Sequence, residues 1–366
     1  MYGIYIKIEL TIMSKISWKV LRFSKHEMTG WKFSCCSADV GVSRCRKFLY
    51  VLEVCMKKIM GGFLSLAMLL AFASCVNGTS PSNPEHGGGT EDAEFTIDGL
   101  NGIKHRNSTI EYTGEVVVLD RDLEVEGDND IPNSVFFNTT SLTPYIMGKY
   151  EVTQGLYKAI MKDRTVDLGE EGTKTLSENP SANTSGDNYP VDSVTWFDTV
   201  YFCNKLSESV NLEPVYTITV TKVDENGHIT AANVNDDTSK NGYRLPTRAE
   251  WEFAARGGNP DDENWLYRYA GSNELTGVAV CGAESSAPVV TKDPNLLEIY
   301  DMTGNLYEWT MDDTHSDHTG NLIDLGGCYR QSNENKLEVG LYADAPAASI
   351  MDTVGIRLVR KYVAVN

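Results

Sequence analysis

Short hydrophobic runs alternate with long polar stretches along this chain, and one run stands out. Residues 242–258 read GYRLPTRAEWEFAARGG. Pro246 disfavours a helical conformation for the residue before it, Thr247 is a good N-cap, and Glu250 three positions later completes a capping box. The pair Gly257–Gly258 then supplies residues that tolerate the left-handed conformation of a helix end. The run therefore predicts a strand end, a turn and a capped helix.

Other patterns predict two main helices and several short strands. Thr153 caps a helix that extends to about Met161, and Thr195 heads a helix to about Ser209. The runs 216–223 and 228–232 alternate about Asn226-Gly227 and predict a hairpin. Further strand-like runs lie at 95–97, 115–119, 134–137, 145–152 and 355–359. The alternating aromatics of 265–269 fit a half-buried strand, or a face that stacks on sugars or peptides.

These elements indicate an α+β domain with little regular secondary structure. Two main helices are set among short antiparallel strands and long loops over residues 95–362. The preceding residues 76–94 are rich in Gly, Ser, Pro and Asn, which is typical of a flexible tether.

Charge divides the chain into two parts. The first 75 residues hold 11 of the 32 Lys and Arg residues but 4 of the 51 Asp and Glu residues. Residues 76–366 are left with 21 basic and 47 acidic side chains, a net charge of −26. Such a surface repels phosphate backbones, so we expect no nucleic-acid partner.

A secretory signal begins inside the chain. Residues 56–58 are Met-Lys-Lys, and residues 61–72 form an apolar stretch too short to span a bilayer. Ala73-Ser74 and Cys75 follow, in the pattern of a bacterial lipobox whose cysteine becomes lipidated. We therefore expect residues 56–75 to be a lipoprotein signal peptide, Cys75 to carry the membrane anchor, and residues 1–55 to be a mis-assigned upstream extension. A plain signal peptide with an incidental cysteine is the alternative.

Five segments in one order carry a family resemblance. They read YIMGKYEVTQGLYKAIM, NYPVDSVTWFDTVYFCNKLSE, GYRLPTRAEWEFAARGG, IYDMTGNLYEWTMDD and, at the end, GG…GIRLVRK. In combination they resemble the formylglycine-generating enzyme (sulfatase-modifying factor) family over roughly residues 95–361. The resemblance implies a C-type-lectin-like α+β fold, often stabilised by calcium.

The resemblance also implies a calcium site. The matching segment runs from Asp301 to Trp309, and its expected ligands are the Asp301 and Glu308 carboxylates with the Gly304 and Leu306 carbonyls. Calcium prefers such a mixture of carboxylate and carbonyl oxygens. A tight turn that leads into a core strand is the alternative reading of the same residues.

The family's catalytic cysteines are replaced in this sequence. Family members oxidise a substrate cysteine with copper(I), using two cysteines that follow a Gly-Gly pair. Here the pair is Gly326–Gly327, and Gln331 and Lys336 occupy the cysteine positions, while the nearby Cys328 stands alone. Because thiolates select copper(I), the sequence disfavours copper and catalysis.

The sequence supports three hypotheses about the function of this protein. The first is a non-catalytic lipoprotein of the bacterial cell envelope, periplasmic or on the outer membrane, that binds a protein, peptide or glycan or serves as a scaffold. Its candidate ligand-binding residues are Tyr329, Arg330, Gln331 and Tyr342. The second is an active formylglycine-generating oxidase, and the third is a calcium-dependent carbohydrate-binding module.

Overall fold

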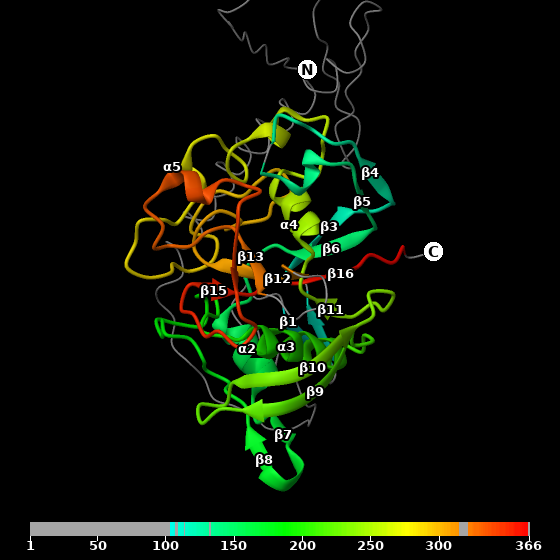
Figure 1. Ribbon diagram of the computed structural model, residues 1–366, viewed down its shortest axis with the longest axis vertical. Coiled ribbons are helices and arrows are strands. Elements are labelled where there is room, and N and C mark those ends of the chain that lie inside the picture. Colours follow the sequence, from blue (N-terminus) through cyan, green and yellow to red (C-terminus); the bar gives the residue numbers. More distant parts are fainter. Residues whose placement is uncertain (1–102, 107–108, 113, 132, 315–320, 365–366) are drawn as a thin grey trace, which may run out of the picture. The chain divides into compact units, whose positions relative to one another are not determined.

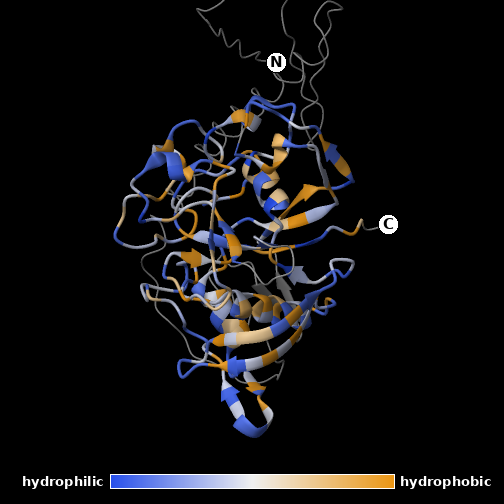
Figure 2. Ribbon diagram, viewed as in Figure 1, coloured by the Kyte–Doolittle hydropathy of each residue, from blue (hydrophilic) through white to orange (hydrophobic). Residues whose placement is uncertain are grey.

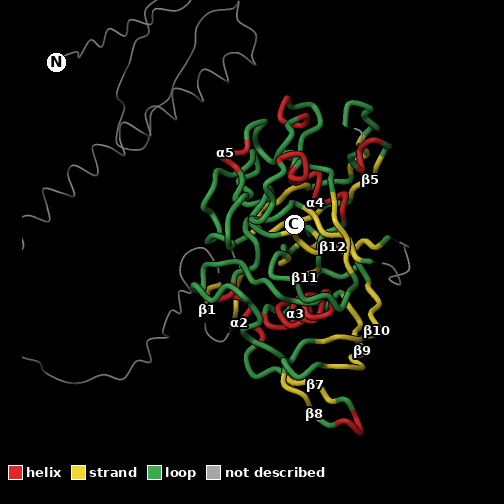
Figure 3. The backbone as a smooth tube through the Cα atoms, turned by 60° about the vertical axis from the view of Figure 1, so that its left-hand side comes forward, coloured by secondary structure: helices red, strands yellow, loops and turns green. Residues whose placement is uncertain are grey.

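The computed structural model describes residues 103–106, 109–112, 114–131, 133–314 and 321–364. The chain divides into two compact units, Met1–Gly88 and Gly89–Asn366, and every described residue belongs to the second. Short strands and helices are joined by long loops in this unit (Figure 3). No described helix combines the length and apolar character needed to cross a bilayer. The predicted signal peptide, Cys75, the tether and the strand at 95–97 lie outside the described residues.

The three longest helices begin where the sequence predicts. Thr153 and Thr195 accept a hydrogen bond from the first turn of their helices, and Thr247 and Glu250 form the predicted capping box. The α-helices are α2 (Gln154–Met161), α3 (Trp196–Ser209), α4 (Arg248–Ala255) and the single turn α5 (Leu275–Val278). The 3-10 turns are η1 (Val135–Phe137), η2 (Gly169–Glu171), η3 (Glu263–Leu266) and η4 (Glu334–Leu337).

Two four-stranded sheets form the centre of the unit (Figure 1). The first is antiparallel, in the order β11 (Tyr243–Arg244), β16 (Val359–Lys361), β6 (Tyr145–Gly148) and β3 (Glu115–Leu119). The second has the order β14 (Tyr342–Ala345), β13 (Leu322–Leu325), β12 (Tyr307–Asp313) and β15 (Val354–Gly355), with a parallel β12–β15 pair.

Four antiparallel hairpins complete the described strands. They are β1 (Ile103–Arg106) with β2 (Thr109–Tyr112), β4 (Leu123–Val125) with β5 (Thr140–Leu142), β7 (Thr165–Asp167) with β8 (Thr173–Thr175), and β9 (Tyr216–Val223) with β10 (Ile229–Asp236). The β9–β10 hairpin confirms the turn predicted at Asn226-Gly227, and hydrophobic and hydrophilic residues mix along it (Figure 2).

Three strand predictions were wrong in part. Residues 134–137 form the 3-10 turn η1, because the Ser134 side chain caps it by accepting from Phe136 N. Residues 265–269 begin in another such turn, η3, where the Trp265 ring packs on Phe136 at 5.1 Å between centroids. The strand predicted at 145–152 ends at Gly148. Capping by Ser134 and packing of the Trp265 ring account for the first two differences, whereas Gly148 N and Val152 N still donate to the carbonyls of Leu358 and Ile356 at and beyond the end of β6.

Residues 355–359 also differ from the single strand predicted. They form the last residue of β15, a connection, and the first residue of β16, so the chain passes here from the second sheet to the first. The side chain of Arg357, in the middle of this crossing, is fully buried.

The second sheet lies between two hydrophobic cores. Trp309 and Leu322 pack into the core that holds α2 and α3, whereas Ile323 and Leu325 pack into the core that holds α4. Since successive side chains of a strand point to opposite faces, both faces of this sheet are buried. All four residues of β13 are buried accordingly.

An ion pair between Glu308 and Arg357 crosses the interior. Arg357 Nη2 lies 2.7 Å from Glu308 Oε1, and neither side chain is more than 1% exposed. Arg357 also donates to the carbonyls of Gly148 and Tyr300, and Trp251 Nε1 of α4 donates to Glu308 Oε2 at 2.5 Å. One carboxylate and one guanidinium thus connect β12, β6, α4 and the crossing between the sheets.

We predict that Arg357→Leu destabilises the full-length chain by about 3–5 kcal/mol, because it leaves the Glu308 carboxylate buried without its cation. Urea denaturation followed by tryptophan fluorescence measures the change. The double variant with Glu308→Leu removes both charges and should recover part of the loss. A cost below about 1 kcal/mol for Arg357→Leu would contradict the role given to the pair.

Candidate functional site

The segment that follows Gly326–Gly327 is held in a fixed turn. Both glycines have positive φ angles, 97° and 77°, and a Cβ on Gly327 would lie 2.3 Å from Leu337 Cδ2. Gly304 N donates to Gly326 O and Tyr329 N donates to Asn305 O, each at 2.8 Å. The turn is therefore bonded directly to the segment in which calcium ligands were predicted.

Gln331 and Lys336, which the sequence predicts to occupy the family's cysteine positions, cannot act as thiolates. The Gln331 amide donates to the Tyr307 hydroxyl oxygen at 3.2 Å, and the Lys336 side chain is exposed on η4. One is a neutral amide and the other a cation, so the pair has no affinity for a soft copper(I) ion.

Cys328 is a buried thiol beside an unusual carboxylate. Burial raises the pKa of the Cys328 thiol, which therefore stays protonated at neutral pH, and Asp324 adds to the shift. Burial also raises the pKa of Asp324 to about 7, with a contribution from the charge of Asp344. Among the described residues, the three cysteines are free: Cys203, Cys281 and Cys328. A buried protonated thiol is a weak nucleophile and a poor metal ligand.

The four candidate ligand-binding residues differ in how far they are exposed to solvent. Tyr329 is buried, whereas Arg330 is more than half exposed, pairs with Asp352 through two contacts of 2.8 and 2.5 Å, and lies over the Tyr329 ring. Tyr342 is 49% exposed on β14, and its ring lies 4.5 Å from the Arg248 guanidinium of α4. With Gln331 half-buried, Arg330 and Tyr342 are the candidates that a partner can reach.

The expected calcium ligands fit an ion only in part. Asp301 Oδ2 accepts from Val290 N at 2.8 Å, but the buried Oδ1 has no hydrogen-bond partner among the described residues. Both Glu308 oxygens are instead engaged by Arg357, and one also by Trp251. Asp301 therefore suits a ligand role, whereas Glu308 is already neutralised by a guanidinium.

The surroundings of Asp301 carry more carboxylates than cations. The buried Glu151 accepts from Asn305 Nδ2 at 2.6 Å and from Leu306 N at 3.0 Å. Burial raises the pKa of Glu151, and the nearby Asp301 and Glu308 raise it further. Burial raises the pKa of Asp301 to about 6. Even so, no group of three or more His, Cys, Asp or Glu side chains in the described part of the chain is arranged to hold a metal ion.

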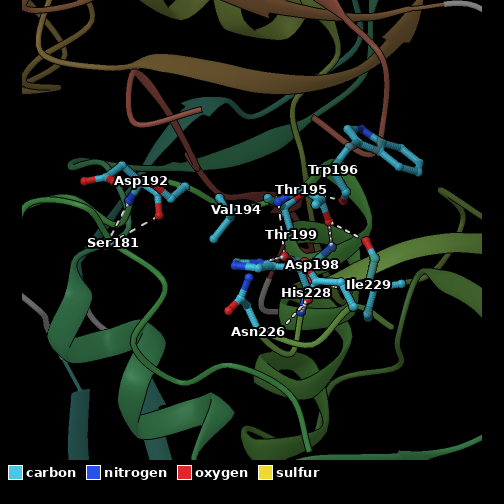
Figure 4. A network of polar contacts seen from close by, with 12 residues as sticks. Ser181, Asp192, Val194, Thr195, Trp196, Asp198, Thr199, Asn226, His228 and Ile229 are labelled. Atoms are coloured by element: carbon cyan, nitrogen blue, oxygen red, sulfur yellow. Dashed lines mark hydrogen bonds and ion pairs between the residues drawn. The ribbon is translucent and has the colours of Figure 1, made fainter. Parts of the chain in front are cut away.

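The structure also reveals a polar network that the sequence patterns did not predict (Figure 4). Asp198, in the first turn of α3, accepts from Thr195 N and from Ile229 N, and lies 2.8 Å from His228 Nδ1. Burial lowers the pKa of His228, but the hydrogen bond and charge of Asp198 outweigh it, so the pKa is raised. Asp198 thereby fastens the β9–β10 hairpin to the start of α3.

The sequence profile of the sulfatase-modifying factor enzyme 1-like domain matches residues 103–362. The chain therefore belongs to the sulfatase-modifying-factor family, in which the formylglycine-generating enzymes are found, and it has their α+β fold.

Two relatives illustrate how far the likeness extends. The chain is 32% identical over 280 residues to the chaperone protein LppX of Paenibacillus barcinonensis, which covers 69% of this chain and 94% of that protein. Its likeness to the formylglycine-generating enzyme of Mus musculus is 32% over 83 residues, 19% of this chain and 22% of the enzyme.

Solved structures agree with the sequence comparisons. CarF superposes with a TM-score of 0.52 at 27% identity, over 68% of this chain and 98% of its own. Treponema denticola variable protein 1 also superposes with a TM-score of 0.52, at 26% identity, over 67% of this chain and 95% of its own.

The Asp198–His228 pair predicts a pH-dependent contribution to stability. Because the folded pKa of His228 lies above its unfolded value of about 6.5, protonated His228 stabilises the fold. This contribution is complete below the unfolded pKa and is lost as pH rises through the folded pKa. The free energy of unfolding of His228→Gln should therefore be lower than that of wild type by about 1 kcal/mol or more at low pH. At high pH the two values should differ little.

Urea denaturation between about pH 5 and 9 measures this difference. Asp198→Asn serves as the matched variant, since it removes the charge that holds the imidazolium and should also abolish the pH dependence of the His228 effect. A wild-type-to-His228→Gln difference that is constant across the range would show that the imidazole is held by packing alone.

Proposed function

We propose that this protein is a non-catalytic member of its family, fixed to a bacterial cell envelope through a lipidated Cys75, and that it binds a polypeptide partner. The observation that carries the proposal is the pair Gln331 and Lys336 in the positions of the two copper-binding cysteines. The buried, protonated Cys328 does not replace them. A fold does not retain a chemistry whose reacting groups are gone.

Two further facts support a binding role. The scaffold around the turn is intact, since the backbone bonds from Gly304 and Tyr329 hold it in place. Most of the length of LppX aligns with this chain, and LppX is named a chaperone protein. A chaperone acts by contact with another polypeptide. Of the four candidate ligand-binding residues, Arg330 and Tyr342 are exposed, and Tyr and Arg are enriched among the residues that dominate protein interfaces.

The first experiment compares catalysis and binding in the same full-length chain. Incubation with copper(I) and a Cys-X-Pro-X-Arg peptide should leave the peptide mass unchanged, because two thiolates are missing. The variant Gln331→Cys with Lys336→Cys restores the thiols and should gain affinity for copper(I). Conversion of the peptide by the wild-type chain would establish the alternative oxidase function.

Binding is tested in cells with a photo-crosslinking amino acid at position 342, and at the exposed Glu170 of η2 as the matched control. Polypeptide adducts at 342 but not at 170, in the membrane fraction, are the expected result. Cys75→Ser should release the protein from that fraction. Retention of glycans rather than polypeptides on the wild-type chain, lost on calcium removal, would favour a carbohydrate-binding module.

We further propose a structural calcium ion, held by Asp301 with the carbonyls of Gly304 and Leu306, and we leave Glu308 out of the ligand set because Arg357 and Trp251 already engage both of its oxygens. The unpartnered Asp301 oxygen and the surplus of buried carboxylates support this proposal. The chemistry such an ion supplies is charge neutralisation in the interior.

Calcium should therefore raise the melting temperature of the full-length chain above that in EDTA, by about 5 °C or more when the ion is at about 100 times its Kd. Differential scanning calorimetry measures the shift. Asp301→Asn should lose the response, whereas Asp187→Asn, at an exposed aspartate, should keep it. Equal melting temperatures in calcium and in EDTA would contradict the proposal of a structural calcium ion.

A further inference from the structure

A cleft of about 970 Å³ lies well apart in sequence from the segment that lost its cysteines. Its walls are strands β3 and β4, the residues 126–130 that follow β4, and the residues 258–261 that follow α4; β3, β4 and α4 are labelled in the upper part of Figure 1. None of its lining residues belongs to 326–342. The cleft is therefore a second surface with its own chemistry.

The lining of the cleft is strongly acidic. Arg121 is its one basic residue, and it lies 3.5 Å from the neighbouring Asp120. The carboxylates that line the cleft are Asp120, Glu124, Glu126, Asp128, Asp130 and Asp261. Apart from Asp120, none of them forms an ion pair with a described residue. Carboxylates gathered in a concave surface focus a negative potential that attracts cationic partners.

Strand edges also line this cleft. Three consecutive residues of β3, Val117 to Leu119, and all three residues of β4 take part in its wall. Successive side chains of a regular strand point to opposite faces, and the pairing of β3 with β6 shifts register between Val117 and Leu119, so a wall of consecutive residues includes backbone. The cleft therefore presents backbone groups as well as side chains.

Strand β3 has no second strand partner among the described residues. It is the last strand of its sheet and pairs with β6 alone among the described strands, while β4 pairs with β5 alone. Val117 of β3 is 43% exposed. An uncovered edge of this kind is a template for pairing with an extended polypeptide.

The buried floor of the cleft is apolar. Val118, Leu119, Val125 and Trp265 are buried residues of its lining. A bound strand would place alternate side chains on each of its faces, and basic residues at every second position would face the acidic lining together. The shape, the strand edge and the charge thus specify one kind of occupant.

We propose that this cleft binds an extended, lysine- or arginine-rich polypeptide segment, which adds a strand to the β3 edge and places its basic side chains among the six carboxylates. This inference does not depend on the function proposed for the region around Gln331, because the two surfaces share no residue.

Fluorescence anisotropy with the full-length chain tests the proposal. The probe is a labelled peptide of about seven residues in which lysine and valine alternate, a length typical of a strand. The cleft variant is Glu124→Lys with Glu126→Lys, and the matched control is Glu170→Lys with Glu171→Lys, since all four side chains are exposed. We expect the cleft variant to weaken binding by about tenfold or more and the control to leave it nearly unchanged.

Two versions of the peptide, N-methylated on alternate amides in the two possible phases, separate strand addition from charge attraction. Methylation removes backbone donors on one edge but keeps every lysine, so one version should bind as the parent does and the other should fail. Equal binding by both versions, or an equal loss in the control variant, would overturn the proposal. Full displacement of the peptide by calcium in wild type would also overturn it, because the cleft would then be a metal site.

Discussion

The buried contact between Glu308 and Arg357 is the interaction on which the described fold depends. Two charges removed from water are costly, and here the cost is offset by hydrogen bonds on every side. The guanidinium donates to Glu308 and to two backbone carbonyls, and Glu308 also accepts from the indole of Trp251. Because these groups come from both sheets and from α4, neither sheet can shift without breaking the pair. Such a pair specifies one arrangement of its surroundings more strictly than apolar packing does.

This interaction also explains why the most distinctive sequence segments occur together. GYRLPTRAEWEFAARGG supplies Trp251, IYDMTGNLYEWTMDD supplies Glu308, and GIRLVRK supplies Arg357. The segments are members of one interior cluster rather than three separate signatures. Their presence therefore reports an intact scaffold, and it carries no information about Gln331 and Lys336, neither of which contacts Glu308 or Arg357.

The proposed non-catalytic role leaves the surfaces of the scaffold as the places where a partner would bind. Two acidic regions of the molecule differ in kind: the interior around Asp301 holds carboxylates that water cannot reach, whereas the cleft beside β3 holds carboxylates that a partner can reach. Buried charge must be neutralised within the protein, by Arg357, by protonation or by an ion. Exposed charge remains available to attract a basic partner. The overall net charge of −19 does not distinguish these cases; the positions of the carboxylates do.

The sequence alone determined the local features that are held by short-range hydrogen bonds. The caps at Thr153, Thr195 and Thr247 and the hairpin turn at Asn226-Gly227 were predictable, because each forms within a few residues of the chain. Family segments extended this to the fold, and they predict that Gln331 and Lys336 stand at the positions of the family's two cysteines. Only the tertiary structure decided that Glu308 lies against Arg357, that Asp198 lies against His228, and that residues 117–130 and 258–265 enclose one cleft. In these cases the role of a charged side chain is set by a neighbour that is distant in sequence, and no local pattern identifies that neighbour.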